Sequence, residues 1–322
     1  MILTVTINPI LIKRLHFTSV KNGGVNRSKS QEFFAGGKGI NVSRQLNILG
    51  AKNQALTVLG GANGKLMRHV LTNEGINFTA ASIKADIRFS TDVYERKTNR
   101  ITSYFSPDFE MTAKEIDEFK GRLERAIANC SIVVFSGSSP CKLADEIFPF
   151  GIEIANKLDK ISILDTYGNH LNNCIENIPL AVHNNVDEVE KSLNIKLSNE
   201  KAKIEYLKSL YNKGIKLSFL TDGEKPAYVC KYGFIHKVTP PKIDLLDATG
   251  SGDAFVAGIA YGLEKANVFN DFVIYASALG AANAEKLDAC TVSKEEAEKF
   301  IDSIKINPIG KKMKIIDDSP NY

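Results

Sequence analysis

The sequence predicts an α/β fold in which helices cover both faces of a mostly parallel β-sheet. From about residue 112 onward, helical patterns alternate with short apolar strand patterns, and strands separated by helices form parallel sheets. Two earlier segments, residues 10–35 and 84–107, instead contain strand-like pieces joined by polar turns. We expect residues 1–322 to form one domain, in which these two segments are insertions that build a small β-sheet lid.

The first part of the chain contains strands and helices that end at recognisable breaks. Alternating apolar residues and threonines predict a strand over residues 2–7, which stops at Asn8 and Pro9. Residues 40–49 place apolar side chains on one helical face until Gly50. The other expected elements here are a strand over 55–59, a helix over 66–74 that closes at Gly75, and a hairpin turn at Thr98 and Asn99.

Helix and strand patterns then follow each other towards the C-terminus. Helices are expected over 113–129, 143–158 and 201–213, and strands over 132–136, 162–165, 180–183 and 216–221. A hairpin with its turn at Tyr232 and Gly233 is expected over 227–237, and helices over 254–265, 270–285 and 293–305. Because ligands bind at the carboxyl ends of parallel strands, the Gly-rich and polar segments that follow strands are candidate binding residues.

Composition and charge exclude several classes of protein. Hydrophobic residues make up 43% and charged residues 24% of the 322 residues, as in ordinary globular proteins. The 41 basic and 37 acidic residues give a net charge of +4, which argues against a nucleic-acid or membrane partner. The five cysteines occur without C-x-x-C spacing, and no apolar run is long enough to span a membrane. We therefore expect a cytoplasmic protein with reduced thiols.

Residues 247–258, with the sequence DATGSGDAFVAG, are the strongest candidate for chemistry. Gly250, Ser251 and Gly252 let the backbone approach a ligand and lead into a helix, whose N-terminal amides attract an anion. Asp253 follows at once, although a carboxylate repels a phosphate bound beside it. This arrangement indicates that Asp253 is a base that takes the proton of a hydroxyl attacking the phosphorus. The alternative is a turn capped by an aspartate that has no catalytic role.

A second Gly-rich segment, residues 35–44 with the sequence AGGKGINVSR, precedes another predicted helix. Lys38 and Asn41 lie near the first turn of that helix. Backbone amides, a cation and an amide side chain could together bind one small polar or anionic ligand. A glycine turn beside a surface lysine would have the same sequence, so this segment alone decides nothing.

In combination, the two segments resemble the two signatures of the PfkB/ribokinase superfamily of sugar kinases. The first signature is GGKG-x-N, and the second is the D-[TS]-x-G-x-GD-like run, represented here by residues 247–253. Their order and separation fit the superfamily. Further markers are Asn8-Pro9, the turn at 60–64, the SGSSP stretch at 136–140, NVDE at 185–188 and the turn at 221–223. The resemblance covers almost the whole chain.

Within this superfamily, the chain is most similar to the branch that contains 1-phosphofructokinases and tagatose-6-phosphate kinases. The resemblance implies a Rossmann-like, ribokinase-like domain with a β-sheet lid that takes part in a homodimer. It also implies an enzyme that transfers the γ-phosphoryl group of ATP, with Mg²⁺, to a hydroxyl of a sugar phosphate. Fructose 1-phosphate and tagatose 6-phosphate are the acceptors that the branch suggests.

The resemblance also assigns roles to individual residues. Asp253 would be the catalytic base, and Glu188 would bind Mg²⁺ indirectly, through its waters. The other assignments are an anion hole of Ala248, Thr249, Gly250, Ser251 and Gly252, a substrate site of Gly36, Gly37, Lys38, Asn41, Arg88 and Ser138, and an ATP site of Asn185, Thr221, Gly223 and Asn283.

Three residues depart from the pattern of this branch. Ile12 stands where the branch has an aspartate that binds sugar hydroxyls, and Ile87 and Phe89 replace the polar residues beside Arg88. An isoleucine cannot accept a hydrogen bond, and an unpaired sugar hydroxyl is costly. The lid side of the pocket is therefore expected to be more apolar than a standard phosphosugar site. Either the chain is a 1-phosphofructokinase that tolerates these changes, or its acceptor has shifted.

Three functions remain open from the sequence. The leading one is an ATP-dependent kinase that acts on a phosphorylated sugar. The second is a kinase of the same fold that acts on a nucleoside or another less polar alcohol, which Ile12 and Phe89 motivate. The third is a non-catalytic regulator that binds a sugar phosphate or a nucleotide. Asp253 argues against the regulator, because a protein without catalysis has no use for a carboxylate beside a phosphate.

Overall fold

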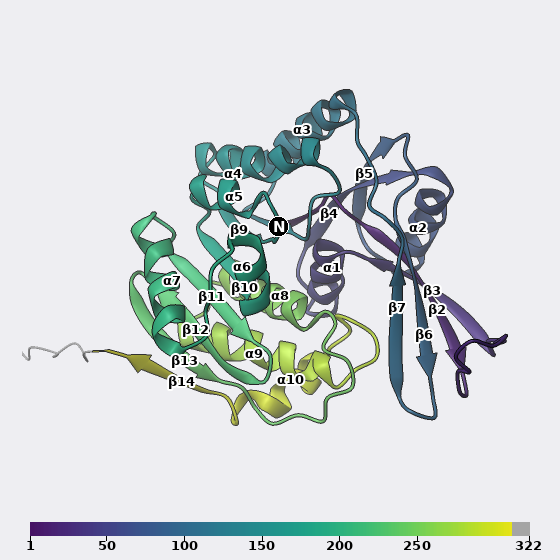
Figure 1. Ribbon diagram of the computed structural model, residues 1–322. Coiled ribbons are helices and arrows are strands. Elements are labelled where there is room, and N and C mark those ends of the chain that lie inside the picture. The colour runs from purple at the N-terminus through teal and green to yellow at the C-terminus, as the bar shows by residue number, and fades with distance from the viewer. Residues whose placement is uncertain (311–322) are drawn as a thin grey trace, which may run out of the picture.

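A computed structural model describes residues 1–310, and residues 311–322 lie outside the description. Its main sheet has ten strands in the order β14-β13-β12-β11-β10-β9-β8-β1-β4-β5 (Figure 1). They are β1 (Ile2–Thr6), β4 (Asn53–Gly60), β5 (Phe78–Ile83), β8 (Ile132–Ser136), β9 (Ile161–Asp165), β10 (Ala181–Asn185), β11 (Leu217–Asp222), β12 (Lys225–Lys231), β13 (Phe234–Thr239) and β14 (Lys305–Ile309). The part of the sheet from β11 to β5 is parallel, while β12, β13 and β14 are added antiparallel. The expected mostly parallel sheet is confirmed.

Helices cover both faces of this sheet, and each face has its own hydrophobic core. They are α1 (Lys38–Ile48), α2 (Gly61–Asn73), α3 (Ala113–Ala128), α4 (Ile147–Lys157), α5 (Leu171–Glu176), α6 (Val186–Leu193), α7 (Glu200–Asn212), α8 (Ser251–Glu264), α9 (Phe269–Ala284) and α10 (Lys294–Ile301), with the 3-10 turn η1 (Lys142–Glu146) before α4. Helices α2 to α7 contribute to one core, and α1, α8, α9 and α10 mainly to the other. In β8, Val133 and Phe135 face the first core while Ile132 and Val134 face the second, because successive strand residues point to opposite faces.

A second sheet of four strands, the lid sheet, extends away from the main sheet in the order β3-β2-β6-β7 (Figure 1). Its strands are β2 (Ile10–Phe17), β3 (Ser30–Gly36), β6 (Phe89–Glu95) and β7 (Arg100–Phe105). They come from the two segments in which a lid was expected, and β2 and β6 join them as parallel neighbours. The β6–β7 hairpin turns at Asn99, which has a positive φ of 54°.

Some element boundaries differ from those that the sequence predicts. Helix α2 begins at Gly61 rather than at residue 66, because its first turn is glycine-rich and its apolar pattern starts later. The sequence pattern also misses α5 and α6, which are short helices. The last predicted helix should reach residue 305, but α10 ends at Ile301 and Lys305–Ile309 forms the edge strand β14. Pro308 is tolerated there because it lies in an edge strand.

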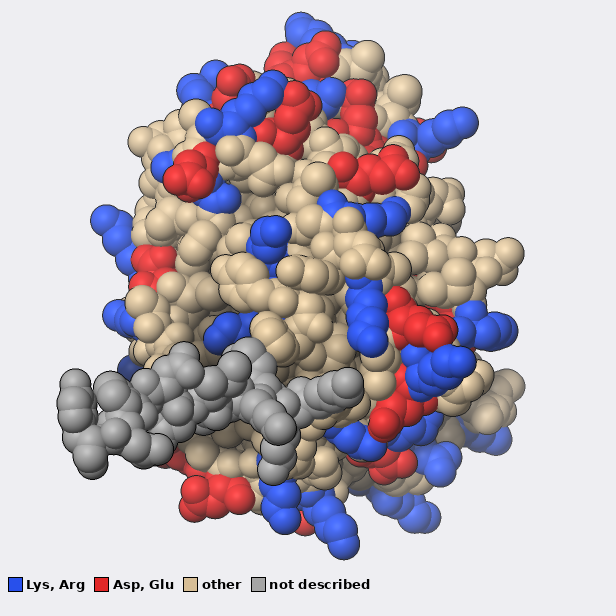
Figure 2. All heavy atoms as spheres, turned by 90° about the vertical axis from the view of Figure 1, so that its left-hand side faces the viewer, with Lys and Arg blue, Asp and Glu red and all other residues tan. Residues whose placement is uncertain are grey.

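Charges on the surface are mixed rather than gathered in one region. On the face shown in Figure 2, Lys and Arg side chains are interspersed with Asp and Glu side chains. This distribution agrees with the near balance of 41 basic and 37 acidic residues. Among residues 1–310, no helix combines the length and the apolar character needed to cross a membrane.

Helices α8 and α9 pack closely because α8 carries glycines at the contact. A Cβ atom on Gly258 would lie 2.6 Å from the Cα of Ala276, and one on Gly262 would lie 2.2 Å from the Cβ of Phe272. Both distances are far below a normal carbon–carbon contact. The contact fixes the position of α8, and thereby of the Gly-rich turn that precedes it.

We expect Gly258→Ala to destabilise the protein by about 1–3 kcal/mol, because the added methyl group forces two packed helices apart. Gly121→Ala is the matched control: Gly121 lies inside α3, and its Cβ would meet only the Arg125 guanidinium, 3.8 Å away. The control should stabilise the protein by about 0.5–1 kcal/mol through helix propensity. Urea unfolding measures both variants, and equal effects would show that the α8–α9 contact is not tight.

Candidate active site

The two Gly-rich segments meet at the carboxyl edge of the main sheet. Helix α1 begins directly after β3, and α8 begins directly after the turn at residues 248–250. A hydrogen bond joins their first turns: Nδ2 of Asn41 donates to Oδ2 of Asp253 over 2.7 Å. The fold therefore unites two segments that are 212 positions apart in the chain.

The glycines of the first segment place α1 directly against β1. Gly37 has a φ of 124°, and a Cβ atom there would lie 2.8 Å from Cγ2 of Thr6. A Cβ atom on Gly39 would lie 2.5 Å from Oγ1 of the same threonine. These glycines thus have a packing role, and the polar residues that they bring into the site are Lys38 and Asn41.

The turn at residues 248–252 presents backbone amides at the N-terminus of α8. Gly250 is the N-cap residue and has a left-handed φ of 82°, which glycine adopts without strain. The amide of Thr249 already donates to Oδ1 of Asp247, and the amide of Ser251 donates to the carbonyl oxygen of Ala248. Two of the five predicted anion-hole amides are therefore engaged inside the turn. The amides of Ala248, Gly250 and Gly252 donate no hydrogen bond to any of the described residues.

The ammonium group of Lys38 lies between two carboxylates. Nζ is 3.2 Å from Oδ1 of Asp165, at the end of β9, and 2.8 Å from Oε1 of Glu188, in the first turn of α6. It is also 5.4 Å from the centre of the Tyr167 ring. The sequence places Lys38 in the substrate site, but here its charge is already balanced by carboxylates.

Asp165 is the centre of this network, and the sequence-based assignment of the site misses it. Its fully buried carboxylate accepts a 2.5 Å hydrogen bond from Oγ of Ser136 and lies 2.9 Å from Nδ1 of His183. Nε2 of His183 is 3.3 Å from Oγ1 of Thr221. When Nδ1 carries the proton, His183 donates to Asp165 and accepts from Thr221. The one available signal was a charged residue at the end of the otherwise apolar strand predicted over 162–165.

Burial and neighbouring charges shift the pKa values of the central groups in different directions. Burial alone would lower the pKa of Lys38, but the carboxylates of Asp165, Glu188 and Asp253 outweigh burial and raise it. Burial would raise the pKa of Asp165, but Lys38 and the hydrogen-bond donors of this carboxylate lower it. For Asp253, burial outweighs the attraction of Lys38, and the charge of Asp165 adds to the effect, so the pKa rises to about 6. Asp253 is therefore suited to exchange a proton near neutral pH.

Arg88 and Ser138 belong to a second polar cluster, which borders Lys38. Nη1 of Arg88 is 3.1 Å from Oδ1 of Asp108, and Nη2 donates to the carbonyl oxygen of Asn8 over 3.0 Å. Nδ2 of Asn8 donates to Asp108 and, over 3.1 Å, to Oγ of Ser138. A Cβ atom on Gly137 would lie 3.7 Å from the Cβ of Lys38. The cluster therefore adjoins the network around Lys38.

Three of the four predicted ATP-binding residues lie at the ends of β10 and β11. Thr221 lies near the end of β11, and Gly223 has a φ of 57° in the turn that follows. Asn185 ends β10 and caps α6: its Oδ1 accepts from the amide of Glu188, whose carboxylate accepts from the amide of Asn185. This capping box fixes the backbone at the carboxylate that contacts Lys38.

Asn283, the fourth predicted ATP-binding residue, supports the turn before α8. It is fully buried in α9. Its Nδ2 donates to the carbonyl oxygen of Thr249 over 2.9 Å, and its Oδ1 accepts from the amide of Cys290 over 2.6 Å. The oxygen and the nitrogen of the side-chain amide therefore both bind backbone groups, and they hold the turn before α8 against the loop that follows α9.

Arg14 joins the lid sheet to that same loop. Nη1 lies 2.5 Å from Oδ1 of Asp288, and Nη2 donates to the carbonyl oxygen of Leu287 over 3.2 Å. The next residue of the loop, Ala289, packs against the turn before α8: a Cβ atom on Gly250 would lie 2.6 Å from its Cβ. The face of β2 that carries Arg14 therefore turns towards the N-terminus of α8.

Of the three departures from the family pattern, only Ile12 lies on this face of the lid. Ile12 is two residues from Arg14, and a Cβ atom on Gly36 would lie 2.6 Å from its Cδ1. Phe89 pairs with the residue before Ile12, so it lies on the opposite face, where it is 45% exposed. Ile87 is buried in the main core. The expectation that Ile87 and Phe89 make the pocket apolar is therefore wrong.

Comparison with known proteins finds relatives over almost the whole chain. The pfkB family carbohydrate kinase model matches residues 5–296. The 1-phosphofructokinase of Borreliella burgdorferi is 30% identical over 312 residues, which are 96% of this chain and 99% of the relative. The tagatose-6-phosphate kinase of Staphylococcus epidermidis is 28% identical over 310 residues, with coverages of 95% and 99%. The crystal structure of phosphofructokinase-2 from Escherichia coli in complex with potassium shares the fold, with a TM-score of 0.87 at 22% identity and coverages of 94% and 98%.

We expect Asp253→Asn to stabilise the folded protein above neutral pH. The pKa of Asp253 is raised to about 6 by folding, so its contribution to stability is present below about pH 4 and is lost as the pH rises through about 6. The ionised side chain then costs on the order of 1–3 kcal/mol, whereas asparagine carries no charge and can still accept from Asn41. Urea unfolding at about pH 5 and about pH 8 should show a gain that grows with pH. A gain that is independent of pH would contradict this burial cost.

Proposed function

The chain belongs to the pfkB family of carbohydrate kinases, and we propose that this kinase transfers the γ-phosphoryl group of ATP to a hydroxyl of a phosphorylated sugar. Two relatives that align with it over nearly their whole length are named 1-phosphofructokinase and tagatose-6-phosphate kinase. The proposed acceptor is accordingly fructose 1-phosphate or tagatose 6-phosphate.

The observation that carries this proposal is the buried carboxylate of Asp253 at the start of α8. Asp253 is 5% exposed, and Asn41 donates a hydrogen bond to one of its oxygens. An aspartate that only capped the helix would accept a backbone amide, but the N-cap residue of α8 is Gly250 and no side chain caps this helix. The second oxygen, Oδ1, is thus left to accept the proton of a substrate hydroxyl.

In the proposed reaction, the attacking hydroxyl loses its proton to Asp253 as its oxygen forms the bond to the γ-phosphorus. The bond between this phosphorus and the bridging oxygen of ATP breaks, and ADP leaves with the electron pair. The amides of Gly250 and Gly252, at the positive end of α8, stabilise the charge on the transferring group. A pKa near 6 keeps Asp253 ionised at neutral pH and leaves it basic enough to take the proton.

Mg²⁺ fits the carboxylate of Glu188, in the first turn of the helix that follows β10. Within residues 1–310, no group of three or more His, Cys, Asp or Glu side chains could hold a metal ion by itself. Mg²⁺ commonly needs only one or two carboxylates, because waters and phosphate oxygens complete its shell. We propose that Glu188 holds the ion indirectly, through its waters, because Asp165 is fully buried and its oxygens are engaged by Lys38, His183 and Ser136. When bound, Mg²⁺ would neutralise charge on the ATP phosphates.

We place the phosphate of the acceptor beside Arg88 and Ser138. The guanidinium of Arg88 is held in place by Asp108 and Asn8, and its side chain is 17% exposed. Arginine binds phosphate through paired hydrogen bonds. Lys38 pairs with two carboxylates, whereas Arg88 pairs with one, that of the 46% exposed Asp108, so Arg88 is the better candidate for the group that selects a phosphorylated acceptor.

A second acceptor class, a nucleoside or another less polar alcohol, is favoured by Ile12 alone. Ile12 lies on the lid face that turns towards the site, and it cannot bind a sugar hydroxyl. Two buried polar residues, Ser90 and Asp92, are aligned on this face with Ile12 and Arg14. The lid therefore retains hydroxyl-binding groups, which is why we favour the phosphosugar.

We further propose that the protein forms a homodimer through the lid sheet. Tyr104 of β7 and Phe89 of β6 are 62% and 45% exposed and lie on the lid face opposite Ile12, while Phe105, which is 64% exposed, lies on the face of Ile12. Exposed aromatic residues on neighbouring strands often mark an interface. Burial of these side chains by a second lid would remove them from water.

Acceptor-dependent ADP release tests the proposed function. We expect turnover with fructose 1-phosphate or tagatose 6-phosphate, and a kcat about 10²–10⁴-fold lower for Asp253→Asn, because general-base assistance is lost. The KM for ATP should change little, since the backbone amides are retained. Turnover of adenosine alone would favour the second acceptor class. A folded Asp253→Asn protein with normal turnover would exclude Asp253 as the base.

Ile12→Asp should increase kcat/KM for the phosphosugar acceptor. A new carboxylate on the lid can accept a hydrogen bond from a sugar hydroxyl, and a charge-assisted hydrogen bond contributes about 1.5–3 kcal/mol, or roughly tenfold or more in kcat/KM. Ile12→Leu is the control and should leave kcat/KM near the wild-type value. If Ile12→Asp improves no sugar phosphate, the acceptor does not place a hydroxyl beside this position.

A further inference from the structure

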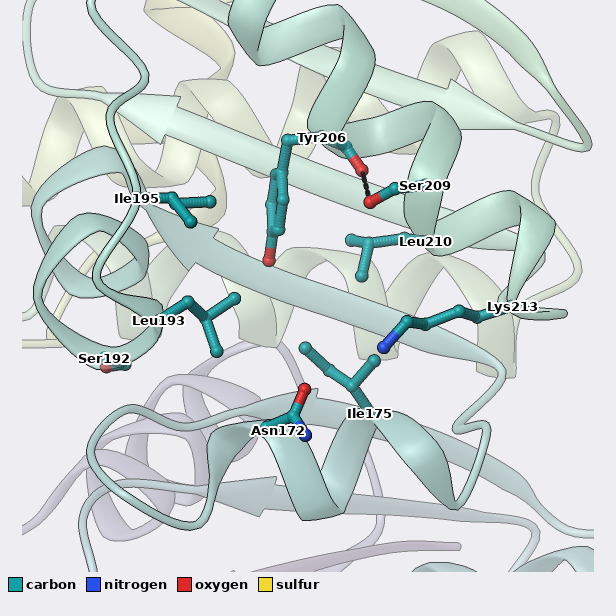
Figure 3. Close-up of a pocket in the computed structure, with 9 residues that line it drawn as sticks. All are labelled: Asn172, Ile175, Ser192, Leu193, Ile195, Tyr206, Ser209, Leu210 and Lys213. Carbon is teal, nitrogen blue, oxygen red and sulfur yellow. Dashed lines mark hydrogen bonds between the residues drawn. The ribbon is translucent and has the colours of Figure 1, made fainter.

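A cavity of about 440 Å³ lies between helices α5, α6 and α7, apart from the residues assigned to catalysis (Figure 3). Its walls are mainly apolar, and Ile175, Leu193 and Leu210 each contribute from a different helix. Cavities of this size between helices commonly hold small molecules. The chemistry of its polar groups indicates which kind of molecule would fit.

Tyr206 of α7 presents a buried hydroxyl group to this cavity. The residue is 8% exposed, and its hydroxyl oxygen lies just beneath the accessible surface of the cavity without a hydrogen-bond partner among the described residues. In Figure 3 the ring stands between Ile195 and Leu210, and the hydroxyl points down towards the space above Leu193 and Ile175. Phenylalanine would fill the same volume without burying an unpaired polar group. The hydroxyl is therefore an unsatisfied hydrogen-bonding group that a ligand in the cavity would reach once the neighbouring side chains of Leu193 and Leu210 shift.

This hydroxyl acts as a donor at neutral pH. Burial raises the pKa of Tyr206 above its ordinary value, so the phenol keeps its proton. A ligand group that accepts a hydrogen bond would satisfy it.

The remaining polar groups favour an anionic ligand. The ammonium group of Lys213, at the end of α7, points towards the same space as the Tyr206 hydroxyl (Figure 3). No carboxylate lies within 4 Å of Lys213 in residues 1–310, and none lines the cavity. The nearby Glu176 accepts a hydrogen bond from Asn172 over 2.7 Å. A cation and a hydroxyl donor thus face an apolar space that lacks an acidic partner.

We propose that this cavity binds a small monocarboxylate with an apolar body. The carboxylate accepts a hydrogen bond from the Tyr206 hydroxyl and pairs with the Lys213 ammonium group. The body of the ligand packs against Ile175, Leu193 and Leu210. A cationic or a neutral analogue would leave at least one of these two polar groups without its partner.

The test uses the full chain and 4-phenylbutyrate as the probe, with isothermal titration calorimetry as the readout. We expect saturable binding with a dissociation constant of about 1 mM or below. The affinity should fall about tenfold in Lys213→Met and about fivefold in Tyr206→Phe. Lys208→Met is the matched control, because Lys208 is an exposed lysine of α7 that does not line the cavity. It should bind the probe as the wild type does, and 4-phenylbutanol should bind more weakly than the carboxylate.

Further controls separate the cavity from the kinase site and from misfolding. Arg88→Ala should leave probe binding unchanged, whereas a loss of affinity there would place the probe in the proposed acceptor site and overturn the assignment. The apo Tyr206→Phe protein should unfold at the wild-type temperature or above, which shows that its loss of affinity is not a folding defect. No saturable binding, or equal affinity in wild type, Tyr206→Phe and Lys213→Met, would also overturn the proposal.

Discussion

One partly buried ammonium group connects the elements that form the site. Lys38 begins α1 and pairs with Asp165 at the end of β9 and Glu188 at the start of α6. The glycines beside Lys38 allow α1 to approach β1 closely enough for this contact. Breaking a buried ion pair by removing one partner costs about 3–5 kcal/mol. The position of α1 against the carboxyl edge of the sheet, and of Asn41 with it, therefore depends on this pairing.

The same network explains why Asp253 has an unusual proton affinity. Lys38 is shared among several carboxylates, and its closest contacts are with Asp165 and Glu188. Asp253 is buried with one side-chain hydrogen bond, from Asn41, and its pKa rises to about 6. The ionised side chain of Asp253, which we propose as the base, thus lowers the stability of the folded protein. Such a cost is common where a site is arranged for chemistry rather than for stability.

The lid sheet is tied to this centre through the loop that follows α9. Arg14 reaches the loop at Asp288, and the loop packs against the turn at Gly250. Asn283 holds the same turn from the other side, through Thr249 and Cys290. A movement of the lid would therefore be transmitted to the backbone amides of the turn at residues 248–252. This continuity gives a physical route by which an acceptor under the lid could influence the phosphoryl-transfer end of the site.

The sequence by itself determined the fold class, the two Gly-rich segments and the candidate base, because apolar periodicity and glycine turns are local signals. It did not reveal Asp165 or His183, since one charged residue at a strand end and one histidine inside a strand have no distinctive pattern. Only the tertiary structure showed that Lys38 is neutralised by carboxylates, because its partners lie more than a hundred residues away. It also decided that Ile12 faces the site while Phe89 does not: the side of a strand that each residue occupies is fixed by the register of β2 and β6, which pair distant segments of the chain.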